Sequence, residues 1–123
     1  MIASAVELQP SQIVCLEHQE TRLFAEVIQI VESRQVGWLR PLMLVFSLSY
    51  DDSNPEQSTL YDLRQGADLL WPIGLLRPAL DTEVVPLFTR LQVTKTQSES
   101  SQLAHQQLQR FVRQVWQAHT GDF

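Results

Sequence analysis

The sequence predicts an α+β domain that is mainly β, in which a small SH3-like β-barrel of about five strands is followed by two C-terminal helices. Up to residue 72, short runs rich in β-branched and aromatic residues alternate with turn residues at regular spacing. Beyond residue 80 the apolar residues recur at helical spacing. Because 123 residues make one ordinary domain, we expect a single domain over 1–123.

The first strands follow a short lead. Residues 1–10 have no clear period and end at Pro10, which predicts a flexible lead. The barrel strands are expected over 12–72, and the first two of them are "QIVCLEH" and "RLFAEVIQIVES", joined by a turn at "QET". Gly37 is the permissive residue expected in the next turn.

The third strand, "WLRPLMLVFSLSY", is apolar on both sides. Simple alternation predicts two faces: Trp38, Leu42, Leu44 and Phe46 on one, and Leu39, Met43 and Val45 on the other. Both faces should therefore be buried, as in a strand that lies between a barrel interior and a covering helix. Pro41 has no N–H to donate to a ladder, so we expect a bulge at Arg40-Pro41.

The remaining strands are short. The run "DDSNPEQS", residues 51–58, is typical of a loop, and "TLYDLR" then predicts a fourth strand. A turn at Gly66 leads to the fifth strand, "DLLWP". Trp71 and Arg77 each precede a proline and should be extended, so the segment continues as a corner and not as a helix.

Two helices complete the chain. A short helix is expected over 81–92, with Asp81 or Thr82 as its N-cap. After the polar linker 93–101, an amphipathic helix is predicted over 101–119. Its apolar stripe consists of Ala104, Leu108, Phe111, Val112, Val115 and Trp116. This helix needs docking for stability, and we expect it to cover its own barrel rather than a partner's surface.

Composition limits the function classes. Fourteen acidic against nine basic residues give a net charge of −5, which disfavours nucleic acid as a partner. A lone cysteine is typical of a reducing compartment, and the N-terminus lacks the pattern of a signal peptide. Arg and Pro interrupt both long apolar runs before the roughly 20 residues that a membrane helix needs. We therefore expect a cytoplasmic protein without a membrane span.

Residues with catalytic potential have structural explanations. His18, His105 and His119 lack metal-binding spacing, and Cys15 and His18 should point to opposite faces of one strand. The acidic residues Asp51, Asp52 and Asp81 suit a loop or a helix cap. Since no nucleotide-binding loop or nucleophile motif occurs, the sequence predicts no enzyme, no catalytic residues, no cofactor and no metal.

Four residues are candidates for protein binding: Trp38, Arg40, Trp71 and Arg77. Tryptophan and arginine are enriched at interface hot spots, and both arginines precede a proline next to apolar residues. The competing interpretation is that the two tryptophans only fill the core. The glutamines of the last helix are interpreted as a solvated face.

The segments "AEVIQIVESRQVGWLRPLML" and "YDLRQGADLLWPIGLLRPALDTEVVPL" resemble small conserved cyanobacterial proteins of unknown function with an SH3-like barrel. The resemblance covers roughly residues 12–91 and includes no catalytic motif. It implies a cytoplasmic accessory role in a photosynthetic or pilus assembly, and it assigns no functional residue.

The leading hypothesis is therefore a non-enzymatic protein-interaction module, an adaptor or accessory subunit of a larger cytoplasmic assembly. One alternative is an RNA-binding small barrel, which requires the arginines to cluster on one face. A weaker alternative is a small-ligand-binding or enzymatic barrel with polar groups converging in a cavity. The two apolar faces of the third strand also allow a homodimer.

Overall fold

The structure is a computed structural model that describes residues 8–46, 59–93 and 98–119. The strands are β1 (Ile13–His18), β2 (Thr21–Val31), β3 (Val36–Phe46), β4 (Thr59–Asp62), β5 (Leu69–Pro72) and β6 (Leu76–Pro78). The one-turn helices η1 (Glu32–Arg34) and η3 (Ile73–Leu75) lie between strands, and α1 (Asp81–Val93) and α2 (Ser98–Ala118) follow. The predicted loop 51–58 and most of the lead 1–10 fall outside the described residues.

The strands form one antiparallel sheet, so the prediction of a mainly β fold with two C-terminal helices is confirmed. The strand order is β4-β3-β2-β1-β6, and β5 also pairs with β3. The described residues contain six strands instead of about five, because the corner after Trp71 contains β6, which pairs with β1. The sheet is open in this arrangement, and its closure into an SH3-like barrel stays a prediction.

Strand β3 organises the sheet. Residues 36–39 of β3 pair with β5, and residues 43–46 pair with β4. Pro41 lies between these two ladders, so its lack of an N–H removes no hydrogen bond to β4 or β5. A bulge is present, but the residue skipped in the register with β2 is Leu42 and not Arg40-Pro41.

The bulge corrects the predicted faces of the third strand. Leu39 and Leu44 belong to one core cluster, whereas Leu42, Met43 and Val45 belong to the other. Simple alternation had placed Leu39 with Met43 and Val45. One extra residue in a strand reverses the direction of every side chain after it, and this explains the difference.

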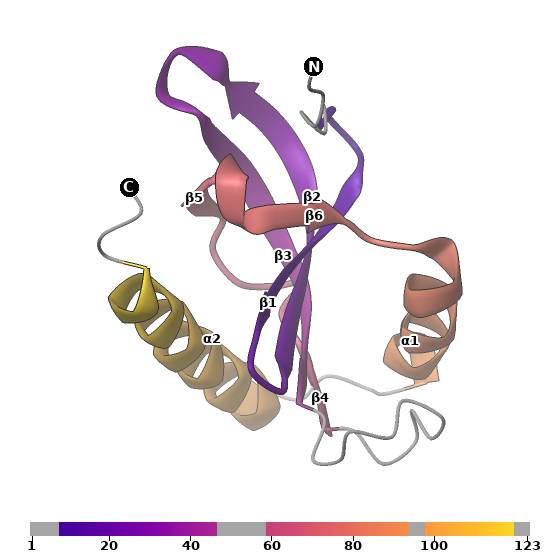
Figure 1. Cartoon of the computed structure of the whole chain (residues 1–123). Helices are drawn as coiled ribbons and strands as arrows, with labels where there is room; N and C mark the ends of the chain where they lie inside the picture. The colour runs from indigo at the N-terminus through magenta and orange to yellow at the C-terminus, as the bar shows by residue number, and fades with distance from the viewer. Residues whose placement is uncertain (1–7, 47–58, 94–97, 120–123) are drawn as a thin grey trace.

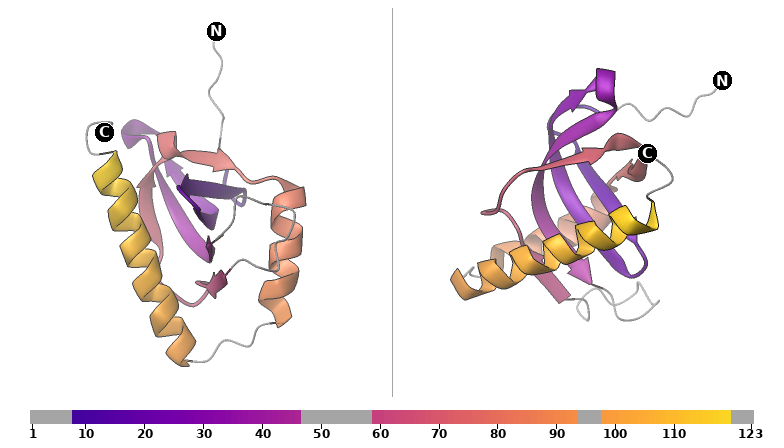
Figure 2. Two further views of the ribbon diagram at one scale, coloured as in Figure 1. Left: turned by 60° about the horizontal axis from the view of Figure 1, so that its bottom comes forward. Right: turned by 90° about the vertical axis from the view of Figure 1, so that its left-hand side faces the viewer.

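Each face of the sheet is covered by one helix (Figures 1 and 2). Helix α2 packs on one face through Ala104, Leu108, Phe111 and Val115, together with Leu39 and Leu44. Helix α1 packs on the other face through Val84, Leu87 and Leu91, against Phe24 and Met43. The expectation that the last helix covers its own sheet is confirmed. The expectation that both faces of the third strand are buried holds from Pro41 to Val45, but it is wrong for the first part of the strand, where Trp38 and Arg40 are exposed.

Two local predictions differ in detail. The turn between β2 and β3 uses Gln35, which has φ 54°, and not Gly37, which lies within β3. The N-cap of α1 is Leu80 and neither Asp81 nor Thr82, because the Leu80 carbonyl accepts the first helical hydrogen bonds. The Leu80 N–H in turn donates to Glu83 Oε1 at 3.2 Å, which is one half of a capping box.

Candidate functional site

Trp38 and Arg40 come together on the exposed side of β3. The Trp38 indole N–H donates to Asp68 Oδ2 at 2.8 Å, and Arg40 Nε lies 3.7 Å from Asp68 Oδ1. Leu70 is the cross-strand neighbour of Trp38 in β5. Trp38 is 40% exposed and Leu70 66% exposed, so two large apolar side chains face solvent side by side. We call Trp38, Arg40, Asp68 and Leu70 the Trp38 surface.

A groove adjoins the Trp38 surface along helix α2. It consists of a hollow of about 760 Å³ and one of about 540 Å³ that share His105 and Leu108 as lining residues. One wall is formed by residues between Asp62 and Trp71, a segment that runs beside α2 in Figure 2. The other wall is α2 itself, from Gln102 to Trp116. We call this the α2 groove. Asp68 and Leu70 belong to both the groove and the Trp38 surface, so the two features are continuous.

Trp71 lies in the core and also lines the α2 groove. It is 3% exposed, and its ring meets that of Trp116 edge-on at a centroid distance of 5.8 Å. The indole nitrogen of Trp71 is buried and has no hydrogen-bond partner among the described residues. Most buried polar groups in proteins have a hydrogen-bond partner, so the unpaired indole nitrogen is an unusual feature of the core next to the groove.

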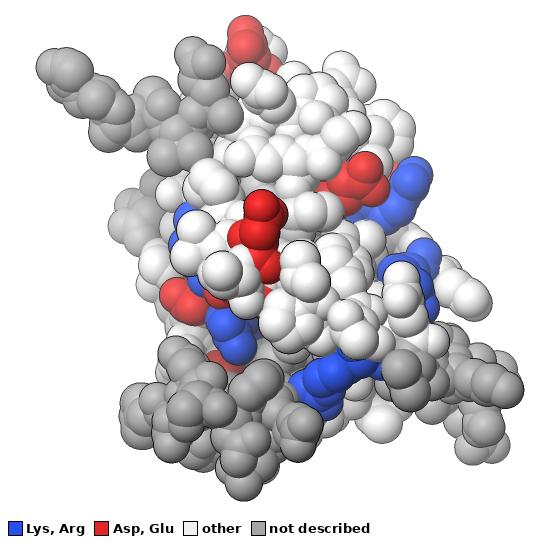
Figure 3. Space-filling view, turned by 90° about the vertical axis from the view of Figure 1, so that its right-hand side faces the viewer, with Lys and Arg blue, Asp and Glu red and all other residues white. Residues whose placement is uncertain are grey.

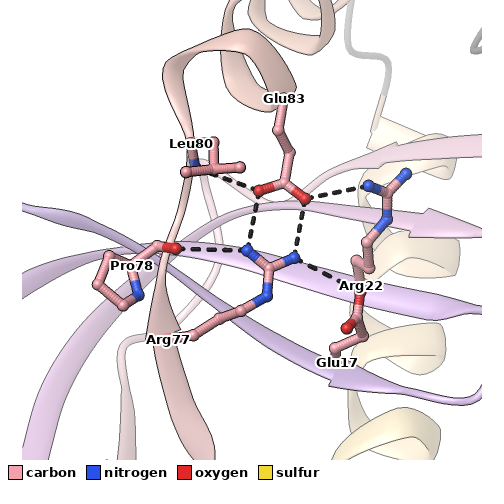
Figure 4. A network of polar contacts seen from close by, with 6 residues as sticks. All are labelled: Glu17, Arg22, Arg77, Pro78, Leu80 and Glu83. Atoms are coloured by element: carbon pink, nitrogen blue, oxygen red, sulfur yellow. Dashed lines mark hydrogen bonds and ion pairs between the residues drawn. The ribbon is translucent and has the colours of Figure 1, made fainter. Parts of the chain in front are cut away.

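Arg77 belongs to an ion-pair cluster on the α1 side of the sheet, shown in Figure 4. Its guanidinium donates to both carboxylate oxygens of Glu83, at 3.0 and 2.8 Å, and to Glu17 at 3.4 Å. Arg22 also donates to Glu83, at 3.1 Å. We call these four residues the Glu83 cluster. It connects the first turn of α1 to β1, β2 and β6, which is a structural role.

The Glu83 cluster changes the pKa of its members and of its neighbour Cys15. The hydrogen bonds from Arg77 lower the pKa of Glu83, and the same contact raises the pKa of Arg77. Burial raises the pKa of the Cys15 thiol to about 12. A nucleophilic cysteine needs a lowered pKa, so Cys15 in this environment is a buried apolar residue and not a nucleophile.

The described residues contain no group of three or more His, Cys, Asp or Glu that could hold a metal ion. Cys15 faces α1 whereas the His18 ring contacts Phe111 of α2, so the two residues point to opposite faces, as predicted. The fold does bring His18 within 6.4 Å of His119, measured between ring centroids, and the distance between them in the sequence gives no sign of this.

The structure thus separates the four residues proposed from the sequence. Trp38 and Arg40 share Asp68 as a partner, Trp71 is in the core, and Arg77 is held in the Glu83 cluster. Leu70 was missed because its exposure depends on the β3–β5 register. The glutamines interpreted as a solvated face include Gln102, Gln106 and Gln109, which line the α2 groove.

Comparison with protein-family models, with curated proteins and with solved structures gave no match for this chain. Within the described residues, neither helix has the length and apolar character required to cross a membrane.

Proposed function

We propose that this chain is a non-enzymatic protein-interaction module that acts as an adaptor or accessory subunit of a larger cytoplasmic assembly. The observation that carries the proposal is the pair of exposed apolar residues Trp38 and Leu70 beside an open groove. Tryptophan and arginine are enriched at protein interfaces, and the centre of an interface is more apolar than the rest of the surface. The resemblance to cyanobacterial proteins directs the search for the partner to photosynthetic and pilus assemblies.

We also propose that the sheet belongs to the SH3-like barrel type. Helix η3 carries the chain directly from β5, on one side of the sheet, to β6, which pairs with β1 on the other side. The Ile73 N–H donates to the Gln35 carbonyl at 3.0 Å and ties this crossing to the turn before β3. An experimental structure in which the sheet stays open between β5 and β6 would contradict the proposal.

The test of the function is capture of a stoichiometric partner by the full chain from native lysate, followed by affinity measurement with the purified partner. Trp38→Ala and Leu70→Ser should each weaken binding at least tenfold without lowering the melting temperature by more than a few degrees. Val85→Ser is the matched control, because Val85 is an apolar residue of α1 that is 60% exposed. If no partner is retained under mild salt, or if all three variants bind as the wild type does, the proposal is wrong.

The alternatives have less support. Figure 3 shows that basic and acidic side chains are interspersed over the described part of the α1 face, whereas an RNA-binding barrel needs a basic area. A retardation assay with single-stranded RNA over a salt series should show no salt-sensitive binding. A ligand cavity is not favoured either, because aliphatic and aromatic side chains fill the space between α2 and the centre of the sheet, and the hollows at the side of α2 form an open groove. Within the chain, α1 and α2 already cover most of the two apolar faces that allowed a homodimer.

A further inference from the structure

The α2 groove has a free strand edge as one of its walls. Among the described strands, β5 pairs only with β3. The Ile73 N–H donates to the Gln35 carbonyl, and hydrogen-bonded pairs alternate along an antiparallel ladder. With the register Trp38↔Leu70, the backbone N–H and C=O of Leu70 therefore point away from β3. An unpaired edge of this kind is a template for another extended chain.

The length of the groove fits such a chain. Its α2 wall runs from Gln102 to Trp116, which is roughly 21 Å at about 1.5 Å per helical residue. An extended chain rises about 3.3 Å per residue, so the groove accommodates a segment of about six residues. Gln102, Gln106 and Gln109 present amide groups along the same wall, and these can both donate to and accept from a peptide backbone.

The charge of the groove indicates one further property of the occupant. Arg113 lines the groove and has no ion-pair or hydrogen-bond partner among the described residues. The other charged side chains of the lining, Asp62 and Asp68, already have arginine partners in Arg64 and Arg40. Arg113 is therefore the charged group of the lining that is left for an occupant, and a carboxylate is the strongest acceptor that a protein segment offers to an arginine.

We propose that the α2 groove binds an extended segment of a partner protein, about six residues long, which adds to β5 as an antiparallel or parallel edge strand and places an acidic side chain at Arg113. The inference rests on the protein-interaction function proposed above and names the form of the partner. Main-chain hydrogen bonds to the β5 edge would supply affinity, and the carboxylate would supply specificity.

The test uses random seven-residue peptides displayed on phage and selected on the full chain, followed by fluorescence-polarisation titration of the selected peptides. We expect peptides with an acidic residue and β-branched neighbours. Arg113→Glu should weaken binding at least tenfold, whereas Arg110→Glu should change it less than twofold. Arg110 is the matched control, because it is exposed on the same helix, does not line the groove, and gives the same change of net charge.

Strand addition has a signature that a merely electrostatic contact lacks. N-methylation of the peptide backbone should abolish binding at every second position and be tolerated at the positions between. Leu70→Pro, which removes an outward-facing N–H as well as the side chain, should weaken peptide binding at least tenfold more than Leu70→Ala does. The peptide measurements remain informative if the proline variant is unfolded by circular dichroism.

Three results would overturn the inference. The first is that no peptide is selected, and the second is that neither Arg113→Glu nor N-methylation changes the affinity of the selected peptides. The third is a concentration-dependent dimer that Leu70→Pro abolishes, because the occupant would then be a second copy of this chain. If the captured partner depends on Trp38 but not on Arg113, this inference fails and the proposed function stands. If no partner is captured at all, the proposed function fails first.

Discussion

The substitution Glu83→Gln tests the contribution of the Glu83 cluster to stability. The Glu83 carboxylate accepts two hydrogen bonds from Arg77, one from Arg22 and one from the Leu80 N–H. The glutamine amide keeps the shape of the side chain but removes its charge. All partners of the Glu83 carboxylate are N–H donors, so the amide NH₂ group, itself a donor, must face one of them. The variant therefore loses at least one contact and leaves both arginines without a counter-ion at this position.

The magnitude follows from the exposure of the partners. A hydrogen bond to a charged group contributes about 1.5–3 kcal/mol when shielded, and an exposed ion pair about 0.2–1 kcal/mol. The Glu83 side chain is 13% exposed but that of Arg77 is 38% exposed, so we place the loss between the two ranges, at about 1.3 kcal/mol. For a domain of this size that corresponds to about 5 °C in melting temperature.

Urea denaturation followed by circular dichroism measures the free energy of unfolding directly. Glu17→Gln is the control, because Glu17 is 52% exposed and meets Arg77 at 3.4 Å, so its loss should cost no more than about 0.5 kcal/mol. A Glu83→Gln variant within 0.5 kcal/mol of the wild type would refute the reasoning.

The same pair of proteins gives a pH test with a definite sign. Arg77 holds the pKa of Glu83 below its ordinary value of 4.5, so the unfolded chain takes up this proton at a higher pH than the folded chain does. The stabilisation by Glu83 is therefore complete above about pH 4.5 and is lost as pH falls through the lower pKa of the folded state. The difference in unfolding free energy between wild type and Glu83→Gln should be constant from pH 7 to 5 and shrink below pH 4.5. An unchanged difference at pH 3 would contradict the pKa shift.

Three further predictions concern the core and the helices. Burial of Cys15, with its pKa raised to about 12, should prevent reaction with iodoacetamide at pH 8 in the folded protein, whereas denaturation in urea should expose it to complete labelling. Phe111→Ala should destabilise the chain by about 3–5 kcal/mol in urea titration, because the ring is 3% exposed and lies between α2 and the sheet; a loss under 1 kcal/mol would mean that α2 is not docked as described. Pro86→Ala should stabilise the chain by about 1–3 kcal/mol, because Pro86 lies in the second turn of α1, where a residue with an N–H can donate to the Thr82 carbonyl. A lower melting temperature of this variant would contradict the prediction.

Much of the fold was accessible from local patterns. The apolar stripe of α2 and the two apolar faces of β3 are visible in the sequence because side-chain direction repeats every 3.6 residues in a helix and every two in a strand. The order of the elements followed from turn residues and prolines. These patterns depend only on residues that are close in the sequence, so they can be recognised without knowing how the rest of the chain folds.

The candidate site was only partly accessible. Trp38 and Trp71 have similar apolar surroundings in the sequence, yet one is 40% and the other 3% exposed. The difference arises because the register places Trp38 opposite Leu70 on the uncovered part of the sheet, whereas Trp71 faces α2. Asp68, which joins Trp38 to Arg40, is 30 residues away from Trp38 along the chain.

The sequence by itself determined a mainly β domain with two C-terminal helices, the last of which is amphipathic. Only the tertiary structure decided which face each residue of β3 occupies, where the α2 groove opens, and that Arg77 pairs with Glu83. A bulge at Leu42 and the pairing of distant strands are set by contacts across the whole molecule. Periodicity reports the direction of a side chain relative to its neighbours, but it contains no information about which surface that side chain meets.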